Sequence, residues 1–242
     1  FLNKFFNRRL HSVLQDADTT IIFQPLWLKT VDINDTKLKN VVYFKTDDYV
    51  SIAANPKQMS VLESQLIKRA NYVCVTAASL LETCDNYHFL PNCIPKALVL
   101  QRDDELCFMG HDNGLLNACF IGAIWDDKVD VDMLMDFIST SKGIKFHIAG
   151  KIYSKKFKNF IKSCDSTRLT FYGVLPFESA QKLAKQCDIG LMPFLVNKYT
   201  DGMFSMKFFE YLAGGTPILV TNLKMLADLH QFSDWYLVCS HF

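Results

Sequence analysis

Lys207 and Glu210 are the two side chains whose types and spacing point most clearly to chemistry. They lie three positions apart in the stretch SMKFFEYLAGGTPILVT (205–221), whose apolar spacing predicts a short helix over 205–213. Lys207 falls in the first turn, where the helix dipole disfavours a cation, and Glu210 follows one turn later on the same face. A lysine beside the free N–H groups of a helix N-terminus can bind phosphate. The alternative is an ordinary i,i+3 ion pair on a solvated face, and the sequence leaves both open.

The neighbours of this pair define where the predicted helix begins and ends. Ser205 stands at its start and can serve either as a cap or as a phosphate contact. Gly214, Gly215 and Pro217 end it, and the apolar run over 217–220 predicts a buried parallel strand. The helical spacing is carried by Met206, Phe209, Leu212 and Ala213.

Two pairs of aspartates also have chemically suggestive positions. Asp47 and Asp48 directly follow a predicted strand, at the edge where open α/β sheets bind ligands, but a polar turn with a helix-capping aspartate explains them equally well. Asp130 and Asp132 form a D-x-D pair of the kind that holds metals, at a predicted helix start where capping is the favoured interpretation. No histidines pair at ligand spacing, and His147 is expected to be a core residue of a strand. We therefore expect no bound metal.

The elements that must position these side chains alternate regularly between strand and helix in the second half of the chain. Such alternation with short links predicts a doubly wound parallel sheet with right-handed crossovers, whose strand ends face a ligand crevice. Strands are expected near 118–122, 145–149, 168–172, 188–192, 217–220 and 235–239, and helices near 130–140, 154–163, 177–186, 205–213 and 223–231. The loops at the ligand edge would contain Gly122, Gly150, Gly173, Pro193 and residues 201–204.

The first half of the chain predicts a smaller set of the same elements. Strands are expected over 20–23, 41–44, 72–76 and 89–92, and helices over 56–70 and 77–84. An amphipathic basic helix over 1–15 is expected to cover the sheet, and contact with an anionic membrane is its alternative role. Residues 94–116 lack periodicity and are expected to connect the two halves.

Composition excludes several classes of function. The chain has 242 residues, of which 50% are hydrophobic and 21% charged, with a net charge of +1, so a globular protein without general affinity for nucleic acid is expected. Its eight cysteines form no CxxC motif and are expected to be reduced thiols, which favours a cytoplasmic location. No apolar run reaches the roughly 20 residues of a membrane span. Because the chain starts at Phe1 and stops just after a predicted strand, we expect a fragment that is incomplete at both ends.

Short motifs spread over almost the whole chain, taken in their order, resemble those of a known protein family. They are TDDY (46–49), ANYVCVTAASL (70–80), FLPN (89–92), CFIGAI (119–124), FHIAGK (146–151), LTFYGVLPFE (169–178), CDIGLMPF (187–194) and KFFEYLAGGTP (207–217). With them the chain resembles the nucleotide-sugar glycosyltransferases of the GT-B fold, in the retaining group with a glycosyltransferase-4-like C-terminal domain. The resemblance implies an α/β protein with two Rossmann-like domains, a partial acceptor-side domain over 1–93 and a donor-binding domain over 117–242.

The resemblance also implies roles for individual residues. Glu210 would bind the ribose of a nucleoside-diphosphate sugar, Lys207 would meet its diphosphate, and Val174 and Leu175 would flank the base. Further donor contacts are expected from Gly122, Gly150, Lys151, Asp201, Gly202, Phe204, Ser205 and Met206, and acceptor-side contacts from Asp47 and Asp48.

Two departures from the family pattern stand out. Many relatives carry a glutamate eight positions before the one at Glu210, where this chain has Gly202. The arginine that often follows the loop glycine is also absent, since Ala123 and Ile124 stand after Gly122. The donor-sugar contacts and part of the phosphate clamp therefore differ from the family's.

The expected function is transfer of a sugar from a nucleoside-diphosphate donor to the hydroxyl of a saccharide or lipid-linked acceptor, in polysaccharide or glycoconjugate synthesis, without metal or cofactor. A cytoplasmic enzyme is expected, with possible peripheral contact at the inner membrane face. A non-catalytic nucleotide-sugar-binding remnant and a GT-B sugar-nucleotide epimerase are the alternatives. No nucleic-acid partner is expected.

Overall fold

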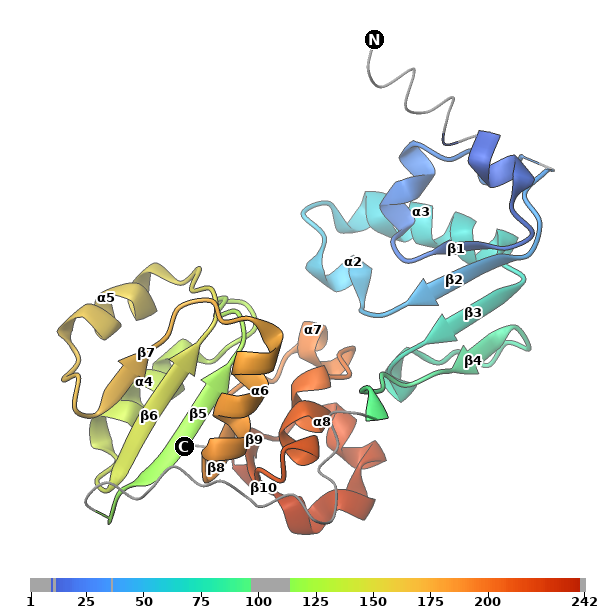
Figure 1. The fold of residues 1–242 in the computed structure, drawn as a ribbon. Helices are drawn as coiled ribbons and strands as arrows, with labels where there is room; N and C mark the ends of the chain where they lie inside the picture. Colours follow the sequence, from blue (N-terminus) through green and yellow to red (C-terminus); the bar gives the residue numbers. More distant parts are fainter. Residues whose placement is uncertain (1–9, 11, 36, 97–113, 240–242) are drawn as a thin grey trace. The chain divides into compact units, whose positions relative to one another are not determined.

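A computed structural model describes residues 10, 12–35, 37–96 and 114–239 of the chain (Figure 1). Its contacts divide the chain into two compact units. The first comprises Phe1–Asn92 together with Asp201–Phe204, and the second comprises Cys93–Thr200 and Ser205–Phe242. The grouping of residues 201–204 with the first unit was not expected from the sequence.

The first unit contains a four-stranded, fully parallel sheet in the order β1-β2-β3-β4. Its strands are β1 (Thr20–Ile22), β2 (Val41–Lys45), β3 (Tyr72–Val75) and β4 (Tyr87–Phe89). Its helical elements are the 3-10 turns η1 (Pro25–Lys29) and η2 (Ala78–Leu80) and the α-helices α2 (Tyr49–Ile52) and α3 (Pro56–Arg69). Helix α3 begins at a proline, is capped by Asn55, and ends in two basic residues, as its sequence predicts.

The centre of the first unit holds a buried polar cluster on β2 and α3. The Tyr43 hydroxyl donates to Glu63 Oε1 at 2.6 Å, and the Lys45 ammonium lies 3.2 Å from the same oxygen. All three side chains are buried. Burial and the adjacent Glu63 carboxylate raise the pKa of Tyr43.

The second unit contains a six-stranded parallel sheet in the order β10-β9-β8-β5-β6-β7. Its strands are β5 (Leu116–Ile121), β6 (Ile144–Ala149), β7 (Leu169–Phe171), β8 (Ile189–Met192), β9 (Ile218–Thr221) and β10 (Tyr236–Cys239). The chain runs outward from β5 to β7, returns to β8 on the other side of β5, and runs outward again to β10. This is the doubly wound order of a Rossmann fold, with its switch point between β5 and β8.

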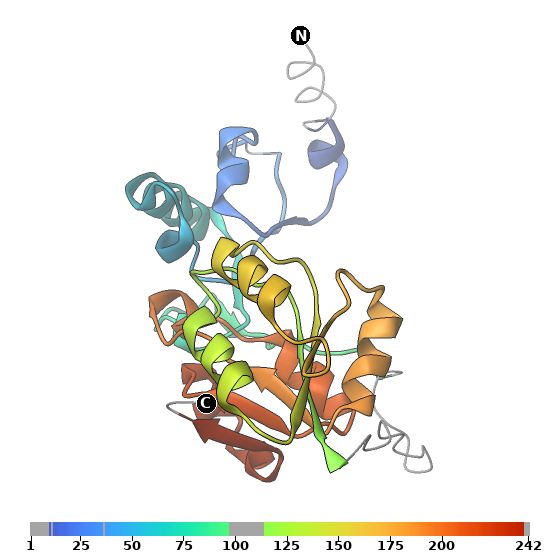
Figure 2. The ribbon, with the colours of Figure 1, turned by 90° about the vertical axis from the view of Figure 1, so that its left-hand side faces the viewer.

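Helices cover both faces of this sheet (Figures 1 and 2). They are α4 (Val131–Thr140), α5 (Lys155–Ser163), α6 (Phe177–Gln186) and α8 (Met206–Ala213). The four-residue helix α7 (Lys198–Asp201) lies between β8 and α8 in the chain. Helix α4 packs with α5, while α6 packs on β5 and α8, and α8 packs on β8 and β9. The order of strands and helices predicted for this half of the chain is thereby confirmed up to β9.

Several local predictions need correction. A helix near 77–84 is only the short 3-10 turn η2, and the helix expected near 223–231 is replaced by two 3-10 segments, η5 (Lys224–Asp228) and η6 (His230–Trp235). Both stretches are rich in Ala and Leu, which are good helix formers, so their local propensity predicted helices that the tertiary structure overrides. Most of the expected helix over 1–15 and of the connection over 94–116 lies outside the described residues.

The predicted apolar face of helix α8 was also wrong. Phe208 and Tyr211 are its most deeply buried side chains, whereas Met206, Phe209 and Leu212 are half-buried. A helix that is covered on most of its circumference gives a weak periodic signal. Within the part of the chain that the structure describes, no helix has both the length and the apolar character needed to cross a membrane.

Candidate functional site

A cavity of about 390 Å³ opens at the carboxyl ends of the second unit's central strands. Its walls come from the loops after β5, β6 and β7 and from helices α6 and α8. The residues that line it are Ile121, Gly122, Ala123, Ala149, Gly150, Lys151, Val174, Leu175, Phe177, Ala180 and Lys207. Open α/β sheets bind their ligands at this edge.

The floor of the cavity depends on close backbone packing between two strand-end loops. Gly150 has φ +134, in the region that favours glycine, and its N–H donates to the Gly173 carbonyl at 2.7 Å. A Cβ atom added at Gly150 would lie only 1.9 Å from the carbonyl oxygen of Gly122. Only glycine therefore allows the two loops to approach as they do.

Helix α8 is held against the end of β5 by Tyr211. The Tyr211 hydroxyl accepts a hydrogen bond from the Ile121 backbone N–H at 3.0 Å and donates to the Cys119 carbonyl at 3.4 Å. Its ring packs on Gly190 of β8, where an added Cβ would lie 2.7 Å from the ring. This anchor places the first turn of α8, which carries Lys207, beside the loop glycine Gly122.

Lys207 and Glu210 form an ion pair within α8, and Lys207 also lines the cavity. The pair is not on a solvated face, because the two side chains are 29% and 12% exposed respectively. The Gln181 side chain of α6 donates a hydrogen bond from Nε2 to Glu210 Oε2 at 3.5 Å. The ion pair therefore forms, but not on the solvated face that one alternative supposed, and its lysine also lines the cavity.

The cavity is lined by two lysines and by an apolar wall. Among the residues that the structure describes, Lys207 and Lys151 are the charged ones that line it, and no carboxylate does. Val174, Leu175 and Phe177 supply an apolar wall. Such a surface suits a ligand that combines anionic oxygens with a flat, less polar group.

Some predicted donor residues do not line this cavity. Ser205 occupies the N-cap position of α8, but its side chain makes no capping hydrogen bond, and Met206 is half-buried in the first turn. Asp201, Gly202 and Phe204 belong to the first unit. Glu210 adjoins the cavity through its partner Lys207.

Within the first unit, segment 201–204 is held by polar contacts. The Asp201 carbonyl accepts from the Ser79 hydroxyl at 2.6 Å, and the Phe204 carbonyl accepts from the Asn92 amide at 2.8 Å. A Cβ added at Gly202 would lie 2.9 Å from the Cβ of Asp48. A larger residue at position 202 would therefore require a shift of either segment.

Asp47 and Asp48 follow β2 directly, and the capping interpretation is confirmed for Asp48. Its side chain accepts a hydrogen bond from the Ser51 N–H at 3.1 Å at the start of α2. The Asp47 carbonyl accepts from the Tyr49 N–H, and its Oδ2 accepts from the Thr46 hydroxyl at 3.3 Å.

The remaining polar candidates have structural roles. Asp130 caps α4 by accepting from the Met133 N–H at 3.0 Å, and Asp132 forms an exposed ion pair with Lys156. His147 is buried and bonds to Asn117 and Tyr172 at 3.0 and 2.9 Å, as expected of a core histidine. Burial lowers the pKa of His147 to about 4. The described residues contain no group of three or more histidine, cysteine or acidic side chains placed to hold a metal ion.

Five lining residues were missed in the sequence: Ile121, Ala123, Ala149, Phe177 and Ala180. Three of them adjoin predicted loop glycines, so strand-end position alone was a usable signal. Phe177 and Ala180 belong to the first turn of α6, which begins two residues after Leu175. The short link between β7 and α6 was the signal that could have identified them.

Comparisons with known proteins agree with this architecture. The sequence profile of a family described as "Glycosyl transferases group 1" matches residues 116–240. A 44-residue stretch is 39% identical to the putative teichuronic acid biosynthesis glycosyltransferase TuaH of Bacillus subtilis (strain 168), and covers 18% of this chain and 11% of that protein.

Solved structures with the same fold cover nearly the whole chain. A crystal structure of Anabaena HepE in complex with UDP matches with a TM-score of 0.72 at 12% identity over 97% of this chain and 68% of HepE. The sucrose-phosphate synthase of Thermosynechococcus elongatus matches with a TM-score of 0.73 at 10% identity over 96% of this chain and 63% of that one. WaaG, a glycosyltransferase involved in lipopolysaccharide biosynthesis, matches with a TM-score of 0.66 at 13% identity over 95% of this chain and 66% of WaaG. The chain thus spans about two thirds of these structures and about a tenth of TuaH.

Proposed function

The chain belongs to the group 1 glycosyl transferases, and from this premise we propose that it moves a sugar from a nucleoside-diphosphate sugar to an acceptor hydroxyl. The expected α/β class with two Rossmann-like units is confirmed, and the solved structures it matches are GT-B glycosyltransferases. The proposed reaction uses no metal and serves polysaccharide or glycoconjugate synthesis.

The observation that carries this proposal is the carboxylate-free cavity with two lysines at the carboxyl edge of the second unit's sheet. A diphosphate would lie against Lys207, Lys151 and the backbone of the loop at Gly122. The first turn of α8 contributes its unpaired N–H groups to the same region. The apolar wall at Val174 and Leu175 would hold the base, as the family resemblance implies.

Catalysis in this proposal is electrostatic. Negative charge develops on the departing diphosphate as the acceptor oxygen attacks, and fixed donors meet that charge. A charge-assisted contact from Lys207 contributes about 1.5–3 kcal/mol, and a helix N-terminus about 0.3–1 kcal/mol at an exposed site. These groups replace the metal ion that other transferases use to neutralise the leaving group.

Donor binding would also rearrange the Lys207–Glu210 pair. The diphosphate would draw Lys207 away, and the Glu210 carboxylate would then accept hydrogen bonds from the ribose hydroxyls. HepE was crystallised with UDP, with UDP and glucose, and with UDP-glucose, so a UDP-sugar is the first donor to test. The proposed donor contacts of Ser205, Met206, Asp201, Gly202 and Phe204 rest on the family resemblance.

The acceptor side of the proposal lies in the first unit. Asp47 and Asp48 would face a saccharide or lipid-linked acceptor at the carboxyl end of β2. We place the protein in the cytoplasm, with peripheral contact at the inner membrane face. The seven cysteines among the described residues are all free thiols, in keeping with a reducing compartment.

A second candidate function is a non-catalytic nucleotide-sugar-binding module. It is favoured by Gly202, which stands where many relatives carry a glutamate and where Asp48 leaves no room for a side chain. Such a module would bind the nucleotide without turning over the donor.

Calorimetry and product detection separate these possibilities. We expect UDP or GDP to bind in the presence of EDTA, and Lys207→Ala to weaken that binding. Absence of nucleotide binding to the folded chain would refute both candidates. Binding without release of free nucleotide from a radiolabelled donor, across a panel of saccharide acceptors, would leave only the binding module.

A further inference from the structure

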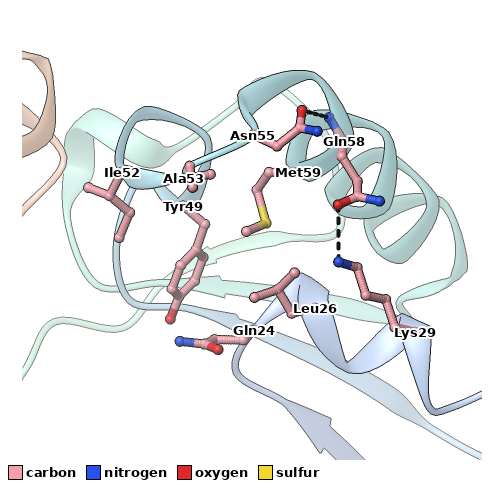
Figure 3. A pocket seen from close by; sticks show the side chains of 10 residues that line it. Gln24, Leu26, Lys29, Tyr49, Ile52, Ala53, Asn55, Gln58 and Met59 are labelled. Atoms are coloured by element: carbon pink, nitrogen blue, oxygen red, sulfur yellow. Dashed lines mark hydrogen bonds between the residues drawn. The ribbon is translucent and has the colours of Figure 1, made fainter.

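A second pocket, of about 340 Å³, lies entirely within the first unit (Figure 3). It is formed by the turn η1 after β1 and by helix α2 and the start of α3 after β2. Strands β1 and β2 are parallel neighbours, so the pocket lies at the carboxyl edge of this sheet. It adjoins Asp47 and Asp48, which immediately precede its lining residue Tyr49. No part of the second unit's cavity is involved.

The interior of the pocket is apolar. The Tyr49 ring, the Met59 thioether and the Leu26 side chain point toward one another across it (Figure 3). Tyr49 and Met59 are buried, so they form a fixed floor, whereas Leu26 and Ile52 are 40% and 43% exposed and form an open rim. Leu26 and Ile52 thus place apolar surface at the mouth of the pocket, where a ligand bound inside would cover part of it.

The polar lining is rich in amides and has one cation. The Lys29 ammonium donates to Gln58 Oε1 at 3.0 Å, and Gln58 in turn donates its backbone N–H to Asn55 at 3.1 Å (Figure 3). Gln24 adds a third amide on the opposite side. Amide groups present both donors and acceptors, which suits hydroxyl groups.

Lys29 is the one charged residue among the described residues that line this pocket. No carboxylate lines it, and among the described residues no acidic side chain forms an ion pair with Lys29. The first turn of α3, whose cap Asn55 borders the pocket, also lacks acidic residues. An anionic group beside Lys29 would therefore meet a positive charge. The Lys29 ammonium could donate a hydrogen bond to it in place of Gln58.

Size limits the ligand further. Ligand pockets span about 300–1,000 Å³, so this one is at the small end and fits a single ring rather than a nucleotide. A sugar ring has an apolar face for Tyr49 and Leu26 and hydroxyl groups for the amides. A neutral sugar would leave Lys29 without a counter-charge, whereas a carboxylate or phosphate substituent would pair with it.

We propose that this pocket binds one anionic sugar unit, with its ring against Tyr49 and Leu26 and its carboxylate or phosphate beside Lys29. The inference rests on the proposed function in one respect, namely that this sugar belongs to the acceptor. Lys29 is then a specificity-determining residue that selects acidic over neutral acceptor sugars.

The test uses the 242-residue chain and three probes: glucuronate, glucose 6-phosphate and glucose. Saturation-transfer NMR and calorimetry should show one or both acidic sugars binding at least tenfold more tightly than glucose. Lys29→Gln, at an exposed position, should reduce this preference about tenfold, which corresponds to about 1.4 kcal/mol. Lys68→Gln, the same change at the exposed far end of α3, is the matched control and should leave it intact.

The outcomes distinguish a carboxylate ligand from a phosphate ligand, and both from a pocket that binds no acidic sugar. A preference for glucuronate identifies a carboxylate ligand and a preference for glucose 6-phosphate a phosphate ligand, and either supports the pocket. Failure of both acidic sugars to bind at about 10 mM, equal binding of glucose, or an unchanged Lys29→Gln variant overturns it. A parallel UDP titration reports on the second unit's cavity alone, so loss of nucleotide binding with intact sugar binding would count against the proposed function and not against this pocket.

Discussion

Replacement of Lys207 by alanine is the most direct test of the second unit's cavity. In the free protein this lysine is paired with Glu210 and lines the cavity, so removing it affects both the ligand and the carboxylate. A charge-assisted contact to a bound diphosphate contributes about 1.5–3 kcal/mol. Ligand binding must first break a partly exposed ion pair worth about 0–1 kcal/mol. The net loss is about 0.5–3 kcal/mol, or roughly 2- to 150-fold in the Kd for UDP.

Calorimetry on wild type and Lys207→Ala measures this change, and Lys158→Ala is the matched control. Lys158 is an exposed lysine of α5 in the same unit and does not line the cavity. Its replacement should change the Kd for UDP by less than about twofold. Urea unfolding of each variant verifies that folding is intact before the affinities are compared.

Added salt provides an independent check of the same reasoning. Screening should weaken UDP binding to wild type more steeply than to Lys207→Ala, because one fewer charge contact is screened in the variant. An unchanged Kd in a folded Lys207→Ala protein, or an equal loss in Lys158→Ala, would refute the assignment of Lys207 to the phosphate.

Three further predictions concern the scaffold. Gly150→Ala should lower the free energy of unfolding in urea by more than about 3 kcal/mol, because the added Cβ would overlap the Gly122 carbonyl. Gly143→Ala, at φ +79 with no atom near the added Cβ, should cost only about 1–2 kcal/mol. Equal losses in the two variants would exclude the overlap with Gly122. Glu63→Gln should cost about 3–5 kcal/mol by leaving Lys45 buried without a counter-charge. The triple variant Tyr43→Phe, Lys45→Met, Glu63→Leu, which also removes the hydroxyl that donates to Glu63, should recover most of it. A loss below about 1 kcal/mol in Glu63→Gln would contradict this. His147 has its pKa lowered to about 4 in the native state, so the unfolded chain binds the proton more readily. The free energy of unfolding should therefore fall by about 3 kcal/mol as the pH drops from about 6.5 to about 4. His147→Gln should remove that part of the pH dependence.

The order of elements in the second unit was predictable from the sequence because two signals agreed. Apolar runs marked the buried parallel strands, and the capping residue Asp130 marked one of the helix starts between them. The doubly wound, parallel character of the sheet then followed from this alternation and the preference for right-handed crossovers. The loop glycines Gly122 and Gly150 were recognisable because they stand directly after strands, where backbones must turn sharply.

Other features depended on contacts that local sequence does not encode. The buried face of α8 is set by Tyr211 packing into the space at Gly190, and those residues lie 21 positions apart. The grouping of segment 201–204 with the first unit rests on hydrogen bonds to Ser79 and Asn92, more than 100 positions away. The pocket beside Tyr49 likewise combines residues from separate elements, none of which forms a recognisable motif.

The Lys207–Glu210 pair shows why spacing alone left two interpretations open. Three positions on a helix bring the two side chains together whether or not a ligand binds there, so the ion pair is what any such sequence would form in the absence of an anion. What distinguishes this pair is its surroundings: a buried Tyr211 anchor, a glycine loop at Gly122 and a second lysine, with no carboxylate in the cavity wall. A purely structural ion pair needs none of these neighbours. In the proposed function, these neighbours make the ion pair the ligand-free state of an anion site, in which Glu210 holds Lys207 in place until a diphosphate competes for it.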